Sequence, residues 1–289
     1  MNSVLIVIPI LVLLMFSLGL SLNMSDFKSV IKKPAALLMG LVGQLFILPA
    51  IAFTVAELFS LAPLFYIGVV LIACCPGGSS SNVFSKIAGG NVALSITLTA
   101  LSSIITIFTI PIVLQIALNQ CGGDFGAEGA PGIIRLPVGK LFVQNIVLMF
   151  VPILLGFLMA RIWPKGAQKT DKVLSKIAFP ALMLLAAIFF IQHHNTIAEN
   201  IGVLGAAVMA MLILSIVVSY LLSAVSALKA RERKTIVIEV GMQNAAQAIA
   251  IASSPFIFNN SALAIPAIIY ALLMNVVLLA YVAVVKRRL

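Results

Sequence analysis

The sequence is poor in charge. Of its 289 residues, 9% are charged and 62% are hydrophobic, whereas a soluble domain has about 25% charged and about 45–50% apolar residues. So few charged side chains cannot cover the water-exposed surface of a chain of this length. The composition predicts an all-α polytopic membrane protein, and it excludes soluble enzymes, fibres and disordered tails.

Cysteine and histidine are also scarce. Cys74 and Cys75 are adjacent in an apolar stretch, and Cys121 is alone. The absence of a CxxC pair excludes a disulfide framework and a redox motif, and the adjacent cysteines are expected to pack as small apolar residues. The two histidines are His193 and His194, and no HExxH or GxGD motif is present. We therefore expect no enzymatic activity.

Nine segments are long and apolar enough to cross a bilayer, which takes about 20 residues. They run over 2–22, 34–56, 62–88, 92–118, 138–160, 173–193, 201–228, 234–254 and 262–285. The longest connector, 119–137, is rich in Gly and Pro and is expected to be external. No soluble domain has room to form, so 1–289 is expected to be one membrane domain surrounded by lipid.

The net charge of +10 comes from Lys and Arg in short clusters between the apolar segments. With the N-terminus outside, 16 of the 18 basic residues fall in cytoplasmic loops or the C-terminal tail, and only Arg135 and Lys140 fall outside. The largest cluster comprises Arg161, Lys165, Lys169, Lys172 and Lys176. The positive-inside rule therefore predicts an external N-terminus and a cytoplasmic C-terminus in a plasma membrane, expected to be a bacterial inner membrane.

Two spans are interrupted by residues that break helices or are polar. The third contains Cys75-Pro76-Gly77-Gly78 followed by Ser79-Ser80-Ser81-Asn82. The eighth contains Glu239, Gly241, Gln243, Asn244 and Gln247. Proline removes a backbone donor and glycine weakens a helix. Two broken spans that cross in opposite directions indicate an inverted-repeat transporter whose hinges are Pro76, Gly77, Gly78 and Gly241. The alternative for the third span is a proline kink without function.

Glu239 is the one acidic residue well inside a span. A buried acid at a helix centre costs roughly 2.5–3.5 kcal/mol on insertion scales, so it indicates a functional site. The alternative is that Glu239 pairs with Arg233 or Lys234, although neither lies on the same helical face. Gln44 is a lone amide in the second span, and its alternative is an interhelical hydrogen bond.

Hydroxyl side chains recur on one face of the fourth span. They are Ser95, Thr99, Ser102 or Ser103, and Thr106. Taken alone, such a stripe is ordinary interhelical packing. Together with Glu239 and the broken spans, it supplies hard oxygen donors, which suit Na⁺ better than zinc or copper. A pair of sites sharing one carboxylate is possible. The alternative is a proton-coupled organic-anion carrier in which Glu239 titrates.

Three motifs, in this order and spacing, resemble the bile acid:sodium symporter family in its bacterial form. They are Cys74-Cys75-Pro76-Gly77-Gly78-Ser79-Ser80-Ser81-Asn82, Gly90-Asn91-Val92-Ala93-Leu94-Ser95 and Glu239-Val240-Gly241-Met242-Gln243-Asn244. The resemblance implies two repeats, 1–118 with four spans and 137–289 with five. It also implies two crossing discontinuous helices, a core of spans two, three, four, seven, eight and nine, and a panel of spans one, five and six.

The resemblance also implies two sodium sites and a substrate site. The first sodium site would use Ser81, Asn82, Ser95, Thr99 and Glu239. The second would use Gln44, Glu239, Val240, Met242 and Gln243. The substrate would meet Ser79, Ser80 and Asn244.

The implied function is sodium-coupled symport of an organic anion by alternating access, in a protein expected to be monomeric. Members of the family often have Thr-Ala-Ser-Asn where this chain has Ser79-Ser80-Ser81-Asn82. The organic anion is therefore expected to be bile-acid-like or a small carboxylate, and because this change falls at substrate-facing positions, the small carboxylate is favoured.

Overall fold

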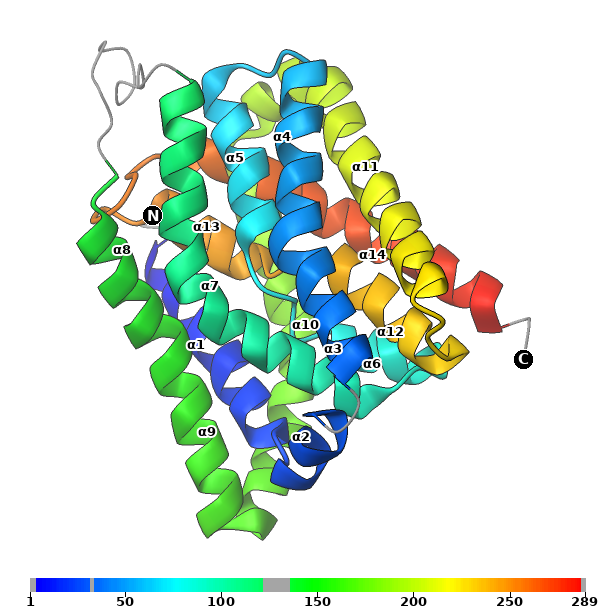
Figure 1. Cartoon of the computed structure of the whole chain (residues 1–289). Helices are drawn as coiled ribbons and strands as arrows, with labels where there is room; N and C mark the ends of the chain where they lie inside the picture. Colours follow the sequence, from blue (N-terminus) through cyan, green and yellow to red (C-terminus); the bar gives the residue numbers. More distant parts are fainter. Residues whose placement is uncertain (1–3, 32–33, 122–135, 287–289) are drawn as a thin grey trace.

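The computed structural model describes residues 4–31, 34–121 and 136–286. Figure 1 shows these residues as one bundle of helices. The helices are α1 Val4–Ser21, α2 Met24–Ile31, α3 Pro34–Val42, η1 Gly43–Ile47, α4 Leu48–Leu58, α5 Pro63–Cys74, α6 Ser81–Ile87, α7 Val92–Gln120, α8 Val138–Asn145, η2 Ile146–Phe150, α9 Val151–Ile162, α10 Pro164–Gln192, α11 His194–Val225, α12 Ala230–Gly241, α13 Ala245–Ser253, η3 Ser261–Ala264 and α14 Ile265–Lys286. Lys32, Lys33, Arg135, Arg287, Arg288 and most of the 119–137 connector lie outside the described residues.

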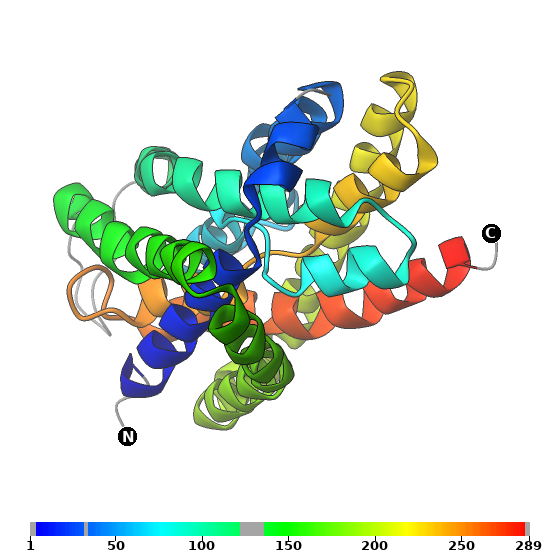
Figure 2. The same ribbon diagram turned by 90° about the horizontal axis from the view of Figure 1, so that it is seen from below.

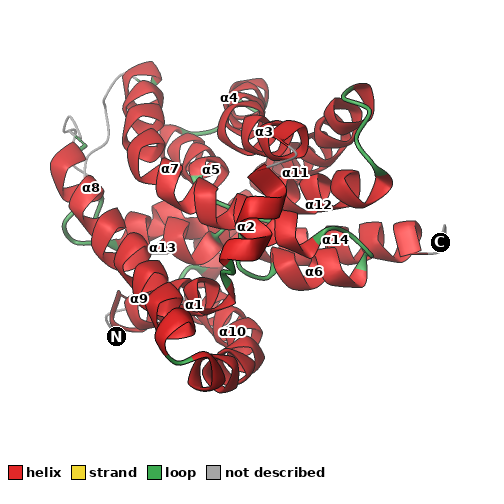
Figure 3. Ribbon diagram, turned by 60° about the horizontal axis from the view of Figure 1, so that its bottom comes forward, coloured by secondary structure: helices red, strands yellow, loops and turns green. Residues whose placement is uncertain are grey.

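Among the described residues, five continuous helical segments are long and apolar enough to cross a membrane. They are Pro34–Leu58, Val92–Gln120, Val138–Ile162, His194–Val225 and Ser261–Lys286. Two shorter apolar helices, Ile6–Ser21 and Pro63–Cys74, accompany them. Within the described ranges the secondary structure is helical throughout, without a named strand (Figure 3). The chain is therefore an all-α polytopic membrane protein, as its composition predicts.

The helices form two groups. α1, α9 and α10 pack against one another on one side of the molecule, and α3 to α7 and α11 to α14 occupy the remainder (Figures 2 and 3). Gly19 of α1 and Gly156 of α9 mark a close crossing in the smaller group. A Cβ at Gly19 would collide with the carbonyl oxygen of Ile153, and one at Gly156 would collide with that of Phe16. Small residues allow this backbone approach, as they commonly do between membrane helices.

Several boundaries differ from those expected from the sequence. α10 begins at Pro164 rather than near residue 173, so the lysines assigned to a loop lie on its first turns. Proline is suited to the first helical position, and polar side chains are compatible with a helix whose face is exposed. The short helix α2 falls in a stretch expected to be a loop.

Two π-helical segments were not expected. η1 ends two residues before Pro49, and η2 ends two residues before Pro152. Proline lacks the backbone donor of an α-helical turn, and a π-bulge accommodates that gap. Gln44 lies in η1, so the π-helical turn determines the direction in which its side chain points.

Candidate functional site

Two broken helices meet inside the larger group. α5 ends at Cys74 and α6 begins at Ser81, while α12 ends at Gly241 and α13 begins at Ala245. The interruptions therefore fall at the positions expected from the sequence. Figure 1 shows the two broken pairs, α5–α6 and α12–α13, near the middle of the bundle.

The two interruptions satisfy each other's backbone groups. The Gly78 amide donates to the Met242 carbonyl at 2.8 Å, and the Asn244 amide donates to the Pro76 carbonyl at 2.9 Å. Gly77 and Gln243 thereby form an isolated antiparallel bridge. Unwound backbone inside a membrane is stable only where it has such partners or lines a polar cavity. The crossing is therefore a hydrogen-bonded contact between two interrupted helices, and the third span is not simply kinked by its proline.

Glu239 is completely buried and lies at this crossing. Its Oε1 accepts hydrogen bonds from the Ser81 hydroxyl, at 2.5 Å, and from the Ser95 hydroxyl. Its Oε2 accepts one from Thr99 Oγ1 at 2.9 Å. These donors belong to α6 and α7, so three elements bring their oxygen atoms to one carboxylate.

The basic residues on α12 do not neutralise this carboxylate. Lys234 Nζ donates to the carbonyls of Ala88, at 3.0 Å, and Val285, at 3.4 Å. The Arg233 guanidinium lies 5.3 Å from the centre of the Tyr220 ring. Pairing of Glu239 with Arg233 or Lys234, the alternative left open by the sequence, is wrong. The described residues leave the charge without a cationic partner.

Only the first half of the hydroxyl stripe on α7 belongs to the site. Ser102 and Ser103 donate to the Thr99 carbonyl at 3.1 and 2.7 Å, and Thr106 donates to the Ser103 carbonyl at 3.3 Å. Their hydroxyls are buried against their own helix. For these three residues, structural packing is the better explanation. Of the hydroxyl side chains in the α7 stripe, those of Ser95 and Thr99 reach Glu239.

Gln44 borders the same space from the π-helical segment η1. A Cβ built on Gly77 would stand 2.6 Å from Glu239 Oε2 and 3.1 Å from Gln44 Nε2, so the amide and the carboxylate share one boundary. Both amide atoms of Gln44 are buried without a hydrogen-bond partner among the described residues. Because such groups are costly to bury, they indicate a ligand that completes them.

Residues 240–243, which follow Glu239, have several oxygen atoms that could bind a cation. The Val240 carbonyl accepts from Gln243 Nε2 at 2.9 Å, and the Met242 carbonyl accepts from the Gly78 amide. Each carbonyl keeps a second lone pair. Gln243 Oε1 is buried without a partner in the described part of the chain. The four residues expected beside Glu239 at a second cation site thus lie next to the crossing, with two of their carbonyls already engaged.

Ser79 and Asn82 line a cavity of about 320 Å³ beside the broken helix α6. α1 and α10 form its opposite wall, where the Ser17 hydroxyl donates to Asp171 Oδ1 at 2.8 Å. Asn82 Oδ1 is buried and has no partner among the described side chains. Among the described residues, no hydrogen bond joins Asn82 to the Glu239 cluster, so the structure places Asn82 at the cavity.

Ser80 precedes α6 and makes no capping hydrogen bond with its side chain. Asn244, which was expected to contact the substrate, has a structural role instead. Asn244 Oδ1 accepts the Gln247 amide at 3.1 Å, which makes Asn244 the N-cap of α13. Its Nδ2 lies 3.9 Å from Met15 Sδ. Asn244 therefore does not line the cavity that Ser79 lines. The spacing Asn244-x-x-Gln247 is a helix-start pattern that could have indicated this role.

Sequence reasoning did not identify two charged residues of the cavity. Lys86 and Asp171 both line it. The available signal for Asp171 was its isolation, because it is the one acid among the four lysines at the start of α10. The cavity thus combines one cation, one anion and several neutral polar groups.

Comparison with known proteins assigns the chain to a family. The model of the sodium bile acid symporter family matches residues 8–200. A Bacillus subtilis protein described as an uncharacterized sodium-dependent transporter is 29% identical over 248 residues, which are 84% of this chain and 72% of that protein.

Other relatives are eukaryotic. A probable chloroplast sodium/metabolite cotransporter of Arabidopsis thaliana is 27% identical over 89% of this chain and 60% of its own length. The human ileal sodium/bile acid cotransporter is 26% identical over 81% of this chain and 65% of its own length. The matched regions thus span less than two thirds of the plant and human relatives. Because the family model covers more than half of this chain, the protein belongs to the sodium bile acid symporter family.

Proposed function

We propose that the protein is a sodium-coupled symporter of a small organic anion that works by alternating access. The observation that carries this proposal is the buried carboxylate of Glu239, which has hydroxyl donors around it and no basic partner among the described residues. Unpartnered buried oxygens of Gln44 and Gln243 lie beside the crossing, and that of Asn82 lies at the adjoining cavity, one residue from Ser81. A cation bound there would compensate the charge and complete these groups.

We assign the first sodium ion to Ser81, Asn82, Ser95, Thr99 and Glu239. We assign the second to Gln44, Glu239, Val240, Met242 and Gln243. All the proposed donors are oxygens, which are the ligands that hard cations prefer. Two ions sharing one carboxylate require neutral oxygens to complete both shells, and hydroxyl, amide and carbonyl groups supply them.

The substrate is assigned to the cavity beside α6. Its volume of about 320 Å³ is near the lower end of the roughly 300–1,000 Å³ range of ligand pockets. Lys86 supplies the cationic group that a carboxylate needs, and Ser79 and Ser80 offer hydrogen-bonding groups at the break. A cavity of this volume fits a small carboxylate better than a bile acid. Contact with Asn244 then belongs to another conformation, because Asn244 is presently engaged at the start of α13.

We also propose how the chain crosses the membrane. Nine spans cross the membrane with the N-terminus outside and the C-terminus cytoplasmic, in two inverted repeats, 1–118 and 137–289. The group of α1, α8–α9 and α10 forms the panel, the other spans form the core, and the protein acts as a monomer. Pro76, Gly77, Gly78 and Gly241 serve as hinges, because each lies at or beside a break in a helix.

Sodium is proposed to bind first and to order the crossing. The proposed ligands lie in or beside the unwound segments, so a cation would hold those segments in one arrangement and present the Ser79–Ser80 backbone to the anion. The coupling must be reciprocal, so the substrate should tighten sodium binding by the same factor by which sodium tightens substrate binding. A coupling of about 1–3 kcal/mol corresponds to roughly 5–150-fold.

The alternatives have less support. The three relatives described above carry sodium in their descriptions, and nothing in the comparisons supports a proton-coupled carrier. These relatives are described as transporters, which agrees with the expectation that the chain is not an enzyme.

A screen of organic anions with and without Na⁺ tests the proposal. Purified protein is heated with carboxylates of graded size, from short-chain acids to a bile acid, in NaCl or in choline chloride of equal ionic strength. A ligand of the folded state raises the melting temperature by mass action. We expect a small carboxylate to stabilise the protein in Na⁺ only, and proteoliposomes to accumulate it under an inward Na⁺ gradient. Equal stabilisation in choline, or uptake without the gradient, would refute sodium coupling.

A further inference from the structure

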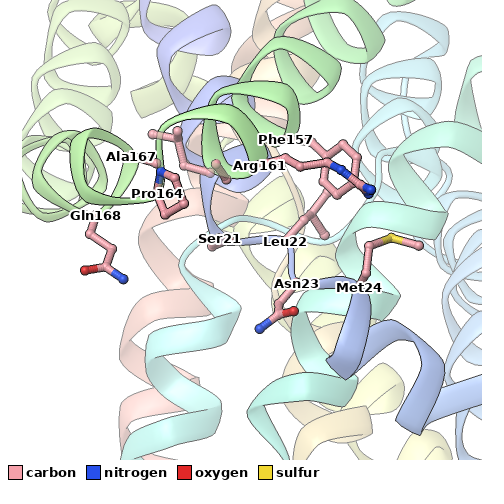
Figure 4. Close-up of a pocket in the computed structure, with 11 residues that line it drawn as sticks. Ser21, Leu22, Asn23, Met24, Phe157, Arg161, Pro164, Ala167 and Gln168 are labelled. Carbon is pink, nitrogen blue, oxygen red and sulfur yellow. The ribbon is translucent and has the colours of Figure 1, made fainter.

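A second cavity lies away from the crossing, where α1 ends and the α9–α10 hairpin turns. It measures about 430 Å³ and contains one cation, Arg161, with Ser21, Asn23 and Gln168 as neutral polar groups. Figure 4 shows Arg161 and Phe157 projecting from α9 near Leu22 and Asn23 of the α1–α2 linker and near Met24 at the start of α2. Within the described part of the chain, the Arg161 guanidinium has no hydrogen-bond or ion-pair partner.

This polar cavity adjoins an apolar one. A second hollow of about 190 Å³ shares Leu22, Asn23, Met24 and Phe157 with it. Beyond these shared residues its walls are entirely apolar and come from α7 and from the η2–α9 helix. They are Ala100, Leu101, Ile104, Phe150, Ile153 and Leu154. A cavity that contains one charged side chain therefore adjoins an apolar cavity between the two groups of helices.

The surroundings of the polar cavity carry further positive charge. Lys165, Lys169, Lys172 and Lys176 are all exposed on α10. Their spacings of four, three and four residues place them on one face of the helix. At the tip of the hairpin, Ile162 is 80% exposed and Trp163 is 63% exposed. Exposed tryptophan flanked by basic residues is typical of the membrane–water interface.

We propose that these two adjoining cavities form a binding site for one anionic phospholipid. The phosphate lies in the polar cavity, where Arg161 pairs with it and Asn23 and Ser21 hydrogen-bond the glycerol or headgroup. One acyl chain lies in the groove between α7 and α9, against Leu154 and Phe150. Basic pockets between membrane helices are suited to such headgroups, and planar guanidinium groups bind phosphate in a two-point geometry.

The two cavities together determine which class of ligand fits the site. A free phosphate or a small soluble anion would use Arg161 but would leave the apolar groove empty. A zwitterionic lipid would fill the groove, but its own cationic headgroup would face Arg161 and the lysine face of α10. Only a ligand with a net negative head and a long apolar tail matches both compartments. The site joins the α1–α2 linker to α9, contains none of the proposed sodium ligands, and shares only Ser21 with the lining of the cavity assigned to the substrate.

Lipid titration of the purified full-length chain in detergent tests the proposal. Thermal unfolding is followed with phosphatidylglycerol, with phosphatidylcholine of the same acyl chains, and with glycerol 3-phosphate alone. We expect phosphatidylglycerol to raise the melting temperature at lower concentration than phosphatidylcholine, and glycerol 3-phosphate to have no effect. Equal stabilisation by glycerol 3-phosphate would overturn the lipid assignment in favour of a free-anion site.

Two pairs of variants separate the headgroup from the tail. Arg161→Gln should weaken the response to phosphatidylglycerol about five- to tenfold and abolish its advantage over phosphatidylcholine. The control Lys140→Gln removes the same charge from an exposed position on α8, away from both cavities and from the lysine face of α10, and should keep that advantage. Leu154→Gln should weaken the response to both lipids, while Leu158→Gln, on the same helix but outside the groove, should not. An unchanged lipid preference in Arg161→Gln, or equal responses of Leu154→Gln and Leu158→Gln, would overturn the proposal.

Discussion

Gly77 lies so close to Glu239 that a Cβ built on the glycine would stand 2.6 Å from the carboxylate Oε2. The glycine is therefore required by the space beside the acid, and not only by the bend of the chain. The nearest other atoms to that Cβ would be Gln44 Nε2 and Thr99 Oγ1, at 3.1 and 3.4 Å. A single methyl group at residue 77 would thus meet three of the proposed sodium ligands at once.

Gly77→Ala is expected to impair sodium binding more than it impairs folding. The added methyl group must displace the Glu239 carboxylate or the backbone bridge, and overpacking of this kind costs about 1–3 kcal/mol. We expect at least a tenfold increase in the Na⁺ concentration needed for half-maximal stabilisation. The matched control is Gly202→Ala, because a Cβ there meets nothing within 4 Å. If both variants bind Na⁺ like the unmodified protein, the carboxylate does not form the site.

The hydroxyl face of α7 provides a graded test. Ser95→Ala and Thr99→Val each remove one neutral oxygen from Glu239. A hydrogen bond to a charged group contributes about 1.5–3 kcal/mol, so each variant should raise the sodium requirement roughly tenfold. Titration of purified protein with NaCl, read by thermal unfolding, measures the effect.

Ser102→Ala is the control for this series. Its hydroxyl is also buried on α7, but it donates to the Thr99 carbonyl and does not contact Glu239. We expect its sodium requirement to remain within about twofold of the unmodified protein, since its loss removes no proposed ligand. Equal effects at Ser102 and at Ser95 would indicate a general packing defect of α7 and not the loss of a ligand.

Much of this site could be predicted from the sequence because its elements have strong signals. A carboxylate within an apolar span, Pro-Gly-Gly within another and hydroxyls at helical spacing each violate the ordinary composition of a membrane helix. The convergence of Glu239 with Ser81, Ser95 and Thr99 follows that pattern. The same periodicity could not separate Ser95 and Thr99 from Ser102, because all three have the same residue chemistry and similar burial.

Other features were not predicted, two because their local signals were weak or misleading and one because it depends on a tertiary contact. The start of α10 at Pro164 was missed, because its four lysines suggested a loop, although an exposed helix face tolerates them. The π-helical turn at Gln44 was also missed, although Pro49 downstream was a local hint. Asp171 became part of a cavity only when α10 approached the Ser17 hydroxyl of α1, a contact between residues far apart in the sequence.

Substitution of Asn244 is expected to change both the stability of the protein and its affinity for the substrate, and the two effects can be separated. Asn244→Ala should lower stability by about 1 kcal/mol, because it removes the N-cap of α13, and it should also weaken substrate binding. Asn244→Ser can retain the cap through its hydroxyl while it removes the amide. We expect Asn244→Ser to restore the melting temperature but not the affinity for the carboxylate identified in the screen. Full recovery of both by serine would restrict Asn244 to its structural role.

Cys121 allows the proposed orientation to be tested. Cys74 and Cys75 are buried, whereas Cys121, at the end of α7, is partly exposed. Burial raises the pKa of the Cys121 thiol. The reactive thiolate therefore becomes more abundant as the pH rises, and labelling is best done at about pH 8.5. A membrane-impermeant maleimide added to intact cells should label the native protein but not Cys121→Ser. Labelling only after the membrane is opened would reverse the topology.

The most direct test of the central claim is the binding of radioactive ²²Na⁺ to purified protein without substrate. Unmodified protein should bind Na⁺ saturably, and K⁺ or choline should not compete. Glu239→Gln keeps the size of the side chain and one acceptor oxygen but removes its buried charge, so saturable binding should be lost while the protein still unfolds cooperatively. Saturable ²²Na⁺ binding of unchanged affinity in a folded Glu239→Gln protein would contradict the account.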